Sequence, residues 1–197
     1  MNNLKGTKTL ENLMKAFAGE SQARNRYTYY AAIAAQEGLK QIESLFLETA
    51  ENEMEHAKRF FNLMREGLNG ELPAMVEVTA TFPVGLGNTL DNLKAAAAGE
   101  NEEWTEVYPL FAEIAAGEGF PEVAAAFRMI GRAEAAHEKR YAKLVENLEN
   151  GMVFKKGDKV FWKCRTCGYI HEGTAAPKAC PACLAPQGAF EVFVENY

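Results

Sequence analysis

Two stretches far apart in the chain each place a glutamate three residues before a histidine. They read Glu53-x-x-His56 and Glu134-x-x-His137, and in both a Lys-Arg-aromatic sequence follows one residue later. On a helix, residues i and i+3 lie on the same face, so each stretch directs a carboxylate and an imidazole at one point. Each stretch therefore has the residue types and the spacing of two ligands that bind one metal site.

Both pairs interrupt apolar stripes that should face a core. Phe46 and Phe60 recur at helical spacing around Glu53, and aromatic residues flank Glu134 in the same way. A buried carboxylate costs several kcal/mol unless it is paired or bound to a metal. For a single pair, a hydrogen bond between glutamate and histidine in the core is the alternative interpretation. The repetition of the motif with its flanking residues favours a metal site.

Helical periodicity predicts four long helices that would position these residues, at about 7–36, 39–65, 88–117 and 121–149. Pro109 is expected to kink the third helix. The segment 67–87 contains Pro73, Pro83 and four glycines, which exclude a continuous helix. A long crossover between the second and third helices is typical of ferritin-like four-helix bundles, so we predict that topology.

The first and third predicted helices resemble each other. An Ala-Gly-Glu sequence ends at Glu20 in the first and at Glu100 in the third, and a tyrosine follows about two turns later, at Tyr27 and Tyr108. Nearly the same offset separates the two Glu-x-x-His motifs. We interpret the chain as an internal duplication of a helical hairpin, which brings four glutamates to the centre of the bundle.

The predicted ligand set is one glutamate from each of two helices and one Glu-x-x-His pair from each of the other two. Its members are Glu20, Glu53, His56, Glu100, Glu134 and His137. This set is that of a di-iron carboxylate bundle. Four carboxylates balance the charge of two ferrous ions, which removes the burial problem. Manganese could be held similarly, because oxygen and imidazole donors do not choose sharply among these metals.

The duplication fails at Glu103. This residue stands three positions after Glu100 on the same face, whereas Ala23 stands three positions after Glu20. A fifth inward carboxylate exceeds what two ferrous ions need for neutrality. One interpretation is that solvent or a neighbouring arginine satisfies Glu103. The other is that Glu103 replaces a histidine ligand on oxidation, because a ferric ion favours carboxylate oxygen.

All the cysteines lie in the last quarter of the chain, in two C-x-x-C pairs. They are Cys164, Cys167, Cys180 and Cys183. Without a secretory signal this pattern indicates a tetrahedral metal site, and zinc and iron both fit the spacing. A segment this short after Gly151 builds only a small core, so a metal should stabilise it. We therefore predict two domains, a helical one at 1–150 and a small β-rich one at 151–197.

The bulk properties limit the classes of function. The 197 residues suit one or two domains, and 48% hydrophobic residues suffice for a substantial core. The net charge of -6, with acids spread along the helices, argues against a nucleic-acid surface. No apolar run approaches the length of a membrane span, and the N-terminal sequence lacks a signal peptide. We expect a cytoplasmic protein.

These motifs together resemble the rubrerythrin family over nearly the whole chain, and residues 162–173 are similar to its rubredoxin knuckle. The resemblance implies a ferritin-like di-iron bundle with a C-terminal rubredoxin-like iron domain. In that family Glu53 and Glu134 would bridge two non-haem irons, and Glu103 would exchange with His56 on oxidation. Tyr27 and Tyr108 would be tyrosines that hydrogen-bond to core carboxylates. Leu184 departs from the rubredoxin pattern, which often has glycine there.

The function implied by this resemblance is that of a peroxidase, which reduces hydrogen peroxide to water in defence against oxidative stress. Electrons would come from an external donor, a reductase or a rubredoxin, through one iron held by the four cysteines. A head-to-tail homodimer would bring one subunit's rubredoxin-like domain near the other's di-iron site. The alternatives are a ferroxidase or oxygen-reducing di-iron protein, and a non-catalytic iron-binding or electron-transfer protein.

Overall fold

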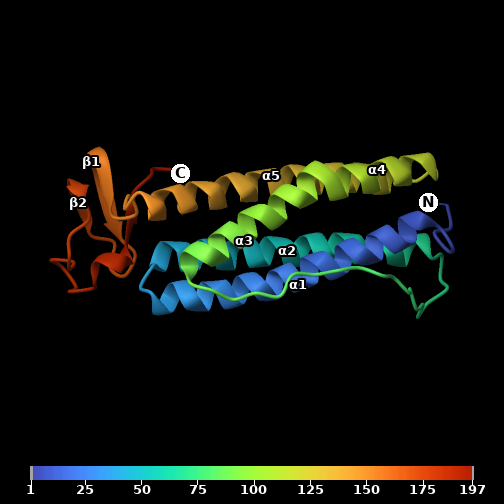
Figure 1. Ribbon diagram of the computed structural model, residues 1–197, viewed down its shortest axis with the longest axis horizontal. Coiled ribbons are helices and arrows are strands. Elements are labelled where there is room, and N and C mark those ends of the chain that lie inside the picture. Colours follow the sequence, from blue (N-terminus) through green and yellow to red (C-terminus); the bar gives the residue numbers. More distant parts are fainter. Residues whose placement is uncertain (1, 197) are drawn as a thin grey trace.

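The computed structural model describes residues 2–196 and contains a long helical bundle followed by a small sheet (Figure 1). The helices are α1 (Lys8–Gln36), α2 (Lys40–Gly67), α3 (Thr89–Glu102), the π-helical turn η1 (Glu103–Val107), α4 (Tyr108–Gly117) and α5 (Pro121–Glu149). The strands are β1 (Lys155–Cys164), β2 (Ile170–Ala175) and β3 (Phe190–Val192), and a short 3-10 turn, η2 (Gln187–Ala189), precedes β3. The predicted fold class, mainly helical with a small β-rich end, is confirmed.

The bundle consists of two helical hairpins. α1 packs against α2 along its length, and α3 with α4 packs against α5. Gly38, with a φ of +75°, makes the tight turn between α1 and α2. The crossover that joins the hairpins runs back along α1 before α3 begins (Figure 1). The long connection predicted between the second and third helices is thus present.

Polar caps fix where two of these helices begin. The Thr7 side chain accepts a hydrogen bond from the Leu10 amide at 3.2 Å at the start of α1. Asn88 accepts one from the Asp91 amide at 2.9 Å at the start of α3. Each cap satisfies a backbone donor that the first turn of a helix leaves without a partner.

Apolar residues fill the bundle on both sides of its polar centre. One core cluster includes Ala16, Phe60 and Ile130, and the other includes Ala23, Phe46 and Tyr141. Along each helix, Glu20, Glu53 and Glu134 stand between a residue of the first cluster and a residue of the second. All three glutamates are almost fully buried. The carboxylates therefore form a polar layer inside an otherwise apolar core.

The third helical segment is not one continuous α-helix over 88–117 as predicted, because it is interrupted just before Pro109. A π-helical turn, η1, precedes the proline, and the Tyr108 amide donates to the Glu103 carbonyl, five residues back. Proline has no N–H, and its ring clashes with the carbonyl four residues earlier in α-geometry. The wider π-turn relieves this conflict by inserting an extra residue into the helix.

The C-terminal sheet has the order β2-β1-β3, with antiparallel pairs. β1 runs as one strand through Lys156-Gly157-Asp158, a sequence that is typical of a turn. Its pairing with β2 is irregular between Lys155 and Val160 instead. Trp162 anchors this domain, because it is fully buried and its indole N–H donates to the Gly173 carbonyl at 3.0 Å.

The sheet domain lies against one end of the bundle, near the turn between α1 and α2 (Figure 1). Arg165 donates to the Ser44 hydroxyl at 2.8 Å, and Gly188 packs directly on the Gly38 carbonyl. None of the helices described within residues 2–196 combines the length and apolar character that a bilayer-spanning helix needs.

Candidate metal centres

The ligands predicted for the bundle come together from four helices. Glu20 comes from α1, Glu53 and His56 from α2, Glu100 from α3, and Glu134 and His137 from α5. They form two clusters, in each of which the candidate ligand atoms lie within 4.8 Å of one another. The first cluster contains Glu20 and His56, the second contains Glu100 and His137, and both contain Glu53 and Glu134.

Glu53 and Glu134 place one carboxylate oxygen in each cluster. His56 Nδ1 lies 3.0 Å from Glu53 Oε2 and 2.9 Å from Glu134 Oε1. His137 Nδ1 lies 3.2 Å from Glu53 Oε1 and 2.8 Å from Glu134 Oε2. This is the geometry of two bridging carboxylates between a pair of cation sites.

Several buried atoms of these clusters lack an oriented hydrogen bond. They are Glu20 Oε2, Glu53 Oε1, Glu100 Oε2, both Glu134 carboxylate oxygens and His137 Nδ1. These atoms lie close together but lack hydrogen-bond geometry, so the candidate ligand atoms face a common centre rather than one another. Buried polar atoms without partners are costly, so bound cations would satisfy what the protein leaves open. The donor set, carboxylate oxygen with imidazole nitrogen, fits a pair of iron ions.

The electrostatics of the clusters also favour bound cations. Burial, reinforced by Glu134 and Glu53, raises the pKa of Glu20 well above its usual value. Burial and the Glu53 and Glu134 carboxylates raise the pKa of Glu100 to about 8, against the lowering effect of His137. Glu20 and Glu100, buried beside other carboxylates, keep protons unless positive charge replaces them. Two divalent cations supply that charge.

The histidines show the complementary shift. Burial lowers the pKa of His56, but the carboxylates of Glu134 and Glu53 outweigh it and raise that pKa to about 10. Burial opposes the shift at His137 too, yet contacts with Glu100, Glu134 and Glu53 raise its pKa to about 12. The carboxylates around both imidazoles therefore stabilise positive charge at these positions, whether a proton or a metal ion provides it.

Two buried tyrosines connect the hairpins across this site. The Tyr27 hydroxyl on α1 donates to Glu100 Oε1 on α3, and the Tyr108 hydroxyl on α4 donates to Glu20 Oε1 on α1. Each tyrosine therefore orients the carboxylate of the other repeat. The resemblance to the rubrerythrin family implied tyrosines bonded to core carboxylates, but the crossed pairing is visible only in the structure.

The π-turn explains why the two repeats differ by one residue in the spacing between glutamate and tyrosine. Tyr27 follows Glu20 by seven residues, whereas Tyr108 follows Glu100 by eight. A π-turn inserts one residue into a helix, so η1 absorbs the difference and returns Tyr108 to the position equivalent to Tyr27. The unequal spacing was therefore the signal in the sequence from which η1 could have been found.

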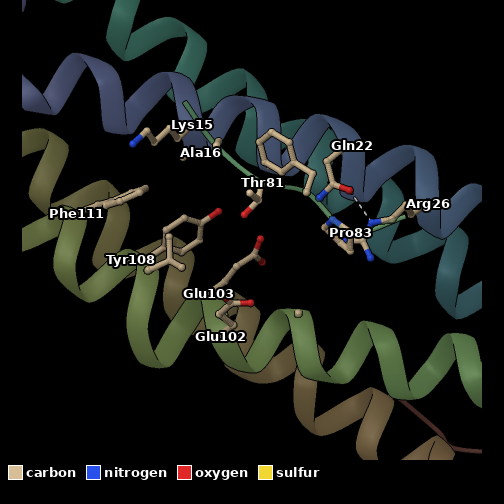
Figure 2. A pocket seen from close by; sticks show the side chains of 15 residues that line it. Lys15, Ala16, Gln22, Arg26, Thr81, Pro83, Glu102, Glu103, Tyr108 and Phe111 are labelled. Carbon is tan, nitrogen blue, oxygen red and sulfur yellow. Dashed lines mark hydrogen bonds between the residues drawn. The ribbon is translucent and has the colours of Figure 1, made fainter. Parts of the chain in front are cut away.

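Glu103, the first residue of η1, belongs to neither cluster. It is only half-buried, and its carboxylate points into a cavity beside the site (Figure 2). Burial and the carboxylates of Glu100, Glu134 and Glu53 raise its pKa well above the usual value, and Arg26 lowers it. Arg26 also lines the cavity and was not singled out from the sequence.

The four cysteines form the second candidate centre. Cys164 Sγ lies 3.8 Å from Cys183 Sγ, and Cys167 Sγ lies 3.6 Å from Cys180 Sγ. Thiolates bound at about 2.3 Å to a tetrahedral metal lie about 3.8 Å apart, so the spacing fits one ion. Burial raises the pKa of the Cys164 thiol, but hydrogen bonds from the Cys167 and Thr166 amides bring it to about 7.

The two knuckles share their backbone geometry. The Gly168 amide donates to the Cys164 carbonyl, and the Leu184 amide donates to the Cys180 carbonyl, both at 2.8 Å. Gly168 has a φ of +79° and Leu184 a φ of +63°. Leu184 therefore adopts the left-handed conformation in which glycine is favoured.

The fold and the two centres define a ferritin-like di-iron protein with a rubredoxin-like four-cysteine site. The family model "Rubrerythrin" matches residues 11–145, and "Rubrerythrin, rubredoxin-like domain" matches residues 162–191. The chain is 61% identical to Rubrerythrin-1 of Clostridium acetobutylicum and 59% identical to rubrerythrin of Clostridium perfringens, each over the full length of both chains. The chain therefore belongs to the rubrerythrin family.

Solved structures agree with this assignment. A structure of nigerythrin in a partially reduced state is 31% identical, with a TM-score of 0.63, and the match covers 98% of this chain and 92% of the other. The fully reduced, all-ferrous state of nigerythrin matches with a TM-score of 0.61 over the same shares of the two chains.

Proposed function

We propose that this protein is a non-haem di-iron peroxidase that reduces hydrogen peroxide to water in defence against oxidative stress. The observation that carries the proposal is the position of Glu103. It provides a fifth carboxylate that lies outside both ligand clusters and faces a cavity. A carboxylate held in reserve beside the site suits a centre whose positive charge increases during its reaction.

The ligands in this proposal are those that the clusters bring together, with Glu103 in reserve. Glu20, Glu53, His56, Glu100, Glu134 and His137 would hold two irons, and Glu53 and Glu134 would bridge them. When bound, two ferrous ions supply the two electrons that, with two protons, convert hydrogen peroxide to two water molecules.

The side chains of the protein have defined tasks in this reaction. Tyr27 and Tyr108 fix the orientation of Glu100 and Glu20 through their hydrogen bonds. Glu103 would approach the first cluster in place of His56, because its carboxylate lies close enough to Glu20 to contribute to the raised pKa of that residue. The apolar clusters on both sides of the polar layer keep bulk water from reaching the site along the bundle axis.

The four cysteines would hold one iron that returns electrons one at a time from an external donor, a reductase or a rubredoxin. Their domain lies at the end of the bundle (Figure 1). The ligand clusters, in contrast, are buried among the helices. A head-to-tail homodimer would bring the cysteine site of one subunit close to the di-iron site of the other. The boundary between residues 150 and 151, a cytoplasmic location and the lack of a nucleic-acid partner remain predictions from the sequence.

A rapid-mixing experiment tests the reaction. Fully reduced, iron-loaded protein is mixed with substoichiometric hydrogen peroxide or with dioxygen, and the visible absorption of the thiolate-bound iron is followed. We expect fast oxidation by peroxide and much slower oxidation by dioxygen. Equal or faster oxidation by dioxygen would favour a ferroxidase or oxygen-reducing function. If no ferric-thiolate absorption forms, the cysteines do not hold a redox-active iron.

The role of Glu103 is tested by substitution. Glu103→Ala should lower peroxide turnover by about a hundredfold, because a charged group that acts as the reaction proceeds is removed. Iron content should stay near that of the wild type, since the six ligands of the two clusters remain. Glu106→Ala, at an exposed glutamate of the same π-turn, is the matched control. Unchanged turnover in Glu103→Ala would rule out this role of Glu103, and an absence of peroxide turnover in the wild type would favour a non-catalytic iron-binding protein.

A further inference from the structure

A cavity of about 270 Å³ opens between α1 and the helical segment formed by α3, η1 and α4 (Figure 2). α1 makes few contacts with α3 or α4, in contrast to its close packing with α2. The carboxylate of Glu103 and the hydroxyl of Tyr108 point into this cavity (Figure 2). Because Tyr108 also donates to Glu20, the inner wall of the cavity touches the residues that hold the first cluster.

Two glycines keep this seam open. Gly19 on α1 and Gly99 on α3 both line the cavity and directly precede the ligands Glu20 and Glu100. A glycine inside a helix destabilises it by about 1 kcal/mol relative to alanine. A Cβ at Gly99 would meet nothing within 4 Å, and one at Gly19 would meet only Phe82 Cε1, at 3.9 Å. Larger residues at both positions would narrow the space in front of Glu103.

The roof of the cavity comes from the crossover. Thr81, Phe82 and Pro83 line it, and the Thr81 hydroxyl points toward the Glu103 carboxylate (Figure 2). Within the described chain, residues 73–84 make no hydrogen bond, whereas Tyr30 donates to the Gly85 carbonyl at 3.3 Å just beyond them. The roof is therefore held by side-chain packing, and Phe82 contributes to it by lying over Gly19.

Phe82 is the bulky side chain that stands between solvent and the glycine-lined seam. Phe82 is 43% exposed to solvent, and Cε1 of its ring lies 3.9 Å from the position that a Cβ on Gly19 would take. A hydroperoxide with a branched carbon next to its O–O group is bulkier than hydrogen peroxide, so a phenyl ring in the lining of the cavity would hinder its entry more. The backbone of Phe82 makes no hydrogen bond with any other described residue, so neither a strand nor a helix fixes the residue in this place.

We propose that this cavity is the path by which the oxidant reaches the Glu103 side of the metal centre, and that Phe82 is a specificity-determining residue that favours hydrogen peroxide over branched alkyl hydroperoxides. The inference rests on the proposed function and deepens it, because it defines the size of the substrate. Gly19 and Gly99 keep this path open because they have no side chains that would fill it.

The specificity of Phe82 is tested with two peroxides. Reduced, iron-loaded protein is mixed with hydrogen peroxide or with tert-butyl hydroperoxide, and the ratio of the two oxidation rates is measured. In Phe82→Ala we expect the rate with tert-butyl hydroperoxide to rise about tenfold or more, the scale on which a pocket discriminates by size, while the rate with hydrogen peroxide stays within about twofold. Phe61→Ala, at an exposed phenylalanine outside the cavity, should leave the ratio unchanged.

The path itself is tested at Gly99. Gly99→Leu should slow oxidation by both peroxides, whereas Gly117→Leu, at another open helical glycine away from the cavity, should not. Crystals of the iron-loaded protein under xenon pressure give a readout without activity. We expect xenon between Gly19 and Gly99 in the wild type and in Gly117→Leu, and none in Gly99→Leu.

Each outcome decides one part of the inference. An unchanged peroxide ratio in Phe82→Ala overturns the specificity role, and unchanged rates in Gly99→Leu overturn the path. Xenon absent from the wild-type cavity also contradicts the path. If dioxygen oxidises the wild type as fast as peroxide does, the proposed function fails, but the ratio between the two peroxides still reports on Phe82.

Discussion

At the scale of single residues, the two tyrosine hydroxyls show how the bundle orients its carboxylates. Glu20 and Glu100 each use one oxygen to accept a hydrogen bond from a tyrosine of the other hairpin, and each keeps its second oxygen without a hydrogen bond. The free oxygen is the one available to a cation. A tyrosine therefore decides which oxygen of each glutamate faces the metal.

We predict that Tyr108→Phe lowers metal affinity or turnover by about 10–100-fold, the usual effect of removing a partner that orients a ligand. The comparison is Tyr30→Phe, a buried tyrosine that bonds to the Gly85 carbonyl and to no candidate ligand. Iron affinity by competition with a chelator and peroxide turnover are the measurements. Equal effects of the two substitutions would mean that Tyr108 only packs.

Leu184 gives a second prediction at this scale. A non-glycine residue in the left-handed region costs about 1–2 kcal/mol, and Leu184 is 80% exposed, so its side chain gains little in return. Leu184→Gly should stabilise the four-cysteine domain by about 1 kcal/mol. Loss of the visible absorption of the iron-thiolate site in denaturant measures this. Val194→Gly, at an exposed residue without a positive φ, should give no gain.

At the scale of elements, Glu118 connects the two hairpins. This residue follows α4, and its carboxylate accepts hydrogen bonds from the Lys8 amide at 3.0 Å and from the Thr9 amide at 2.7 Å. It thus adds to the cap of α1, where an anion also interacts favourably with the helix dipole. Slight burial raises the pKa of Glu118, but the hydrogen bonds from Thr9 and Lys8 outweigh it, and the net pKa is lowered.

The lowered pKa fixes the direction of a pH effect. A carboxyl whose folded pKa lies below its unfolded pKa stabilises the fold above the unfolded value, about 4.3, and loses that effect as the pH falls through the folded value. Glu118→Gln should therefore lower stability at pH 7 by only a few tenths of a kcal/mol, because solvent screens this exposed carboxylate, and the difference from the wild type should shrink below about pH 4. Thermal unfolding of both full-length proteins across this range measures it. A difference independent of pH would rule out the charge of Glu118 as its origin.

At the scale of the whole molecule, the contact between Gly38 and Gly188 sets how the small domain sits on the bundle. A Cβ at Gly188 would lie 1.8 Å from the Gly38 carbonyl oxygen, a distance at which the backbone must move. The hydrogen bond from Arg165 to Ser44 lies at the same junction. Two glycines therefore allow the four-cysteine domain to rest directly on the turn between α1 and α2.

We predict that Gly188→Ala displaces the four-cysteine domain without unfolding either part. Small-angle X-ray scattering should show a larger radius of gyration, and the return of electrons to the bundle should slow by about tenfold or more, because a small displacement of reacting groups has large effects on rates. Gly157→Ala, at a glycine of the same domain with open space around it, should change neither quantity. An unaltered scattering profile in Gly188→Ala would contradict this role of the junction.

The sequence by itself determined the parts of this protein that depend on local spacing. The i and i+3 positions of Glu53 and His56 share a helix face wherever that helix packs, and two C-x-x-C pairs close on one ion by local turns. The four helices, the long crossover and the two groups of candidate ligands followed from such patterns. The unequal spacing of Tyr27 and Tyr108 from their glutamates also indicates the π-turn, because one extra residue separates Glu100 from Tyr108.

Only the tertiary structure decided the features that join distant segments. Neither the crossed hydrogen bonds of the tyrosines, nor the position of Phe82 over Gly19, nor the contact of Gly188 with Gly38 follows from any local pattern, because each depends on how rigid helices pack. A helix fixes the direction of its side chains but not the partner that they meet. That choice is made by packing across the whole chain, which is why the candidate ligands could be predicted and the proposed path to them could not.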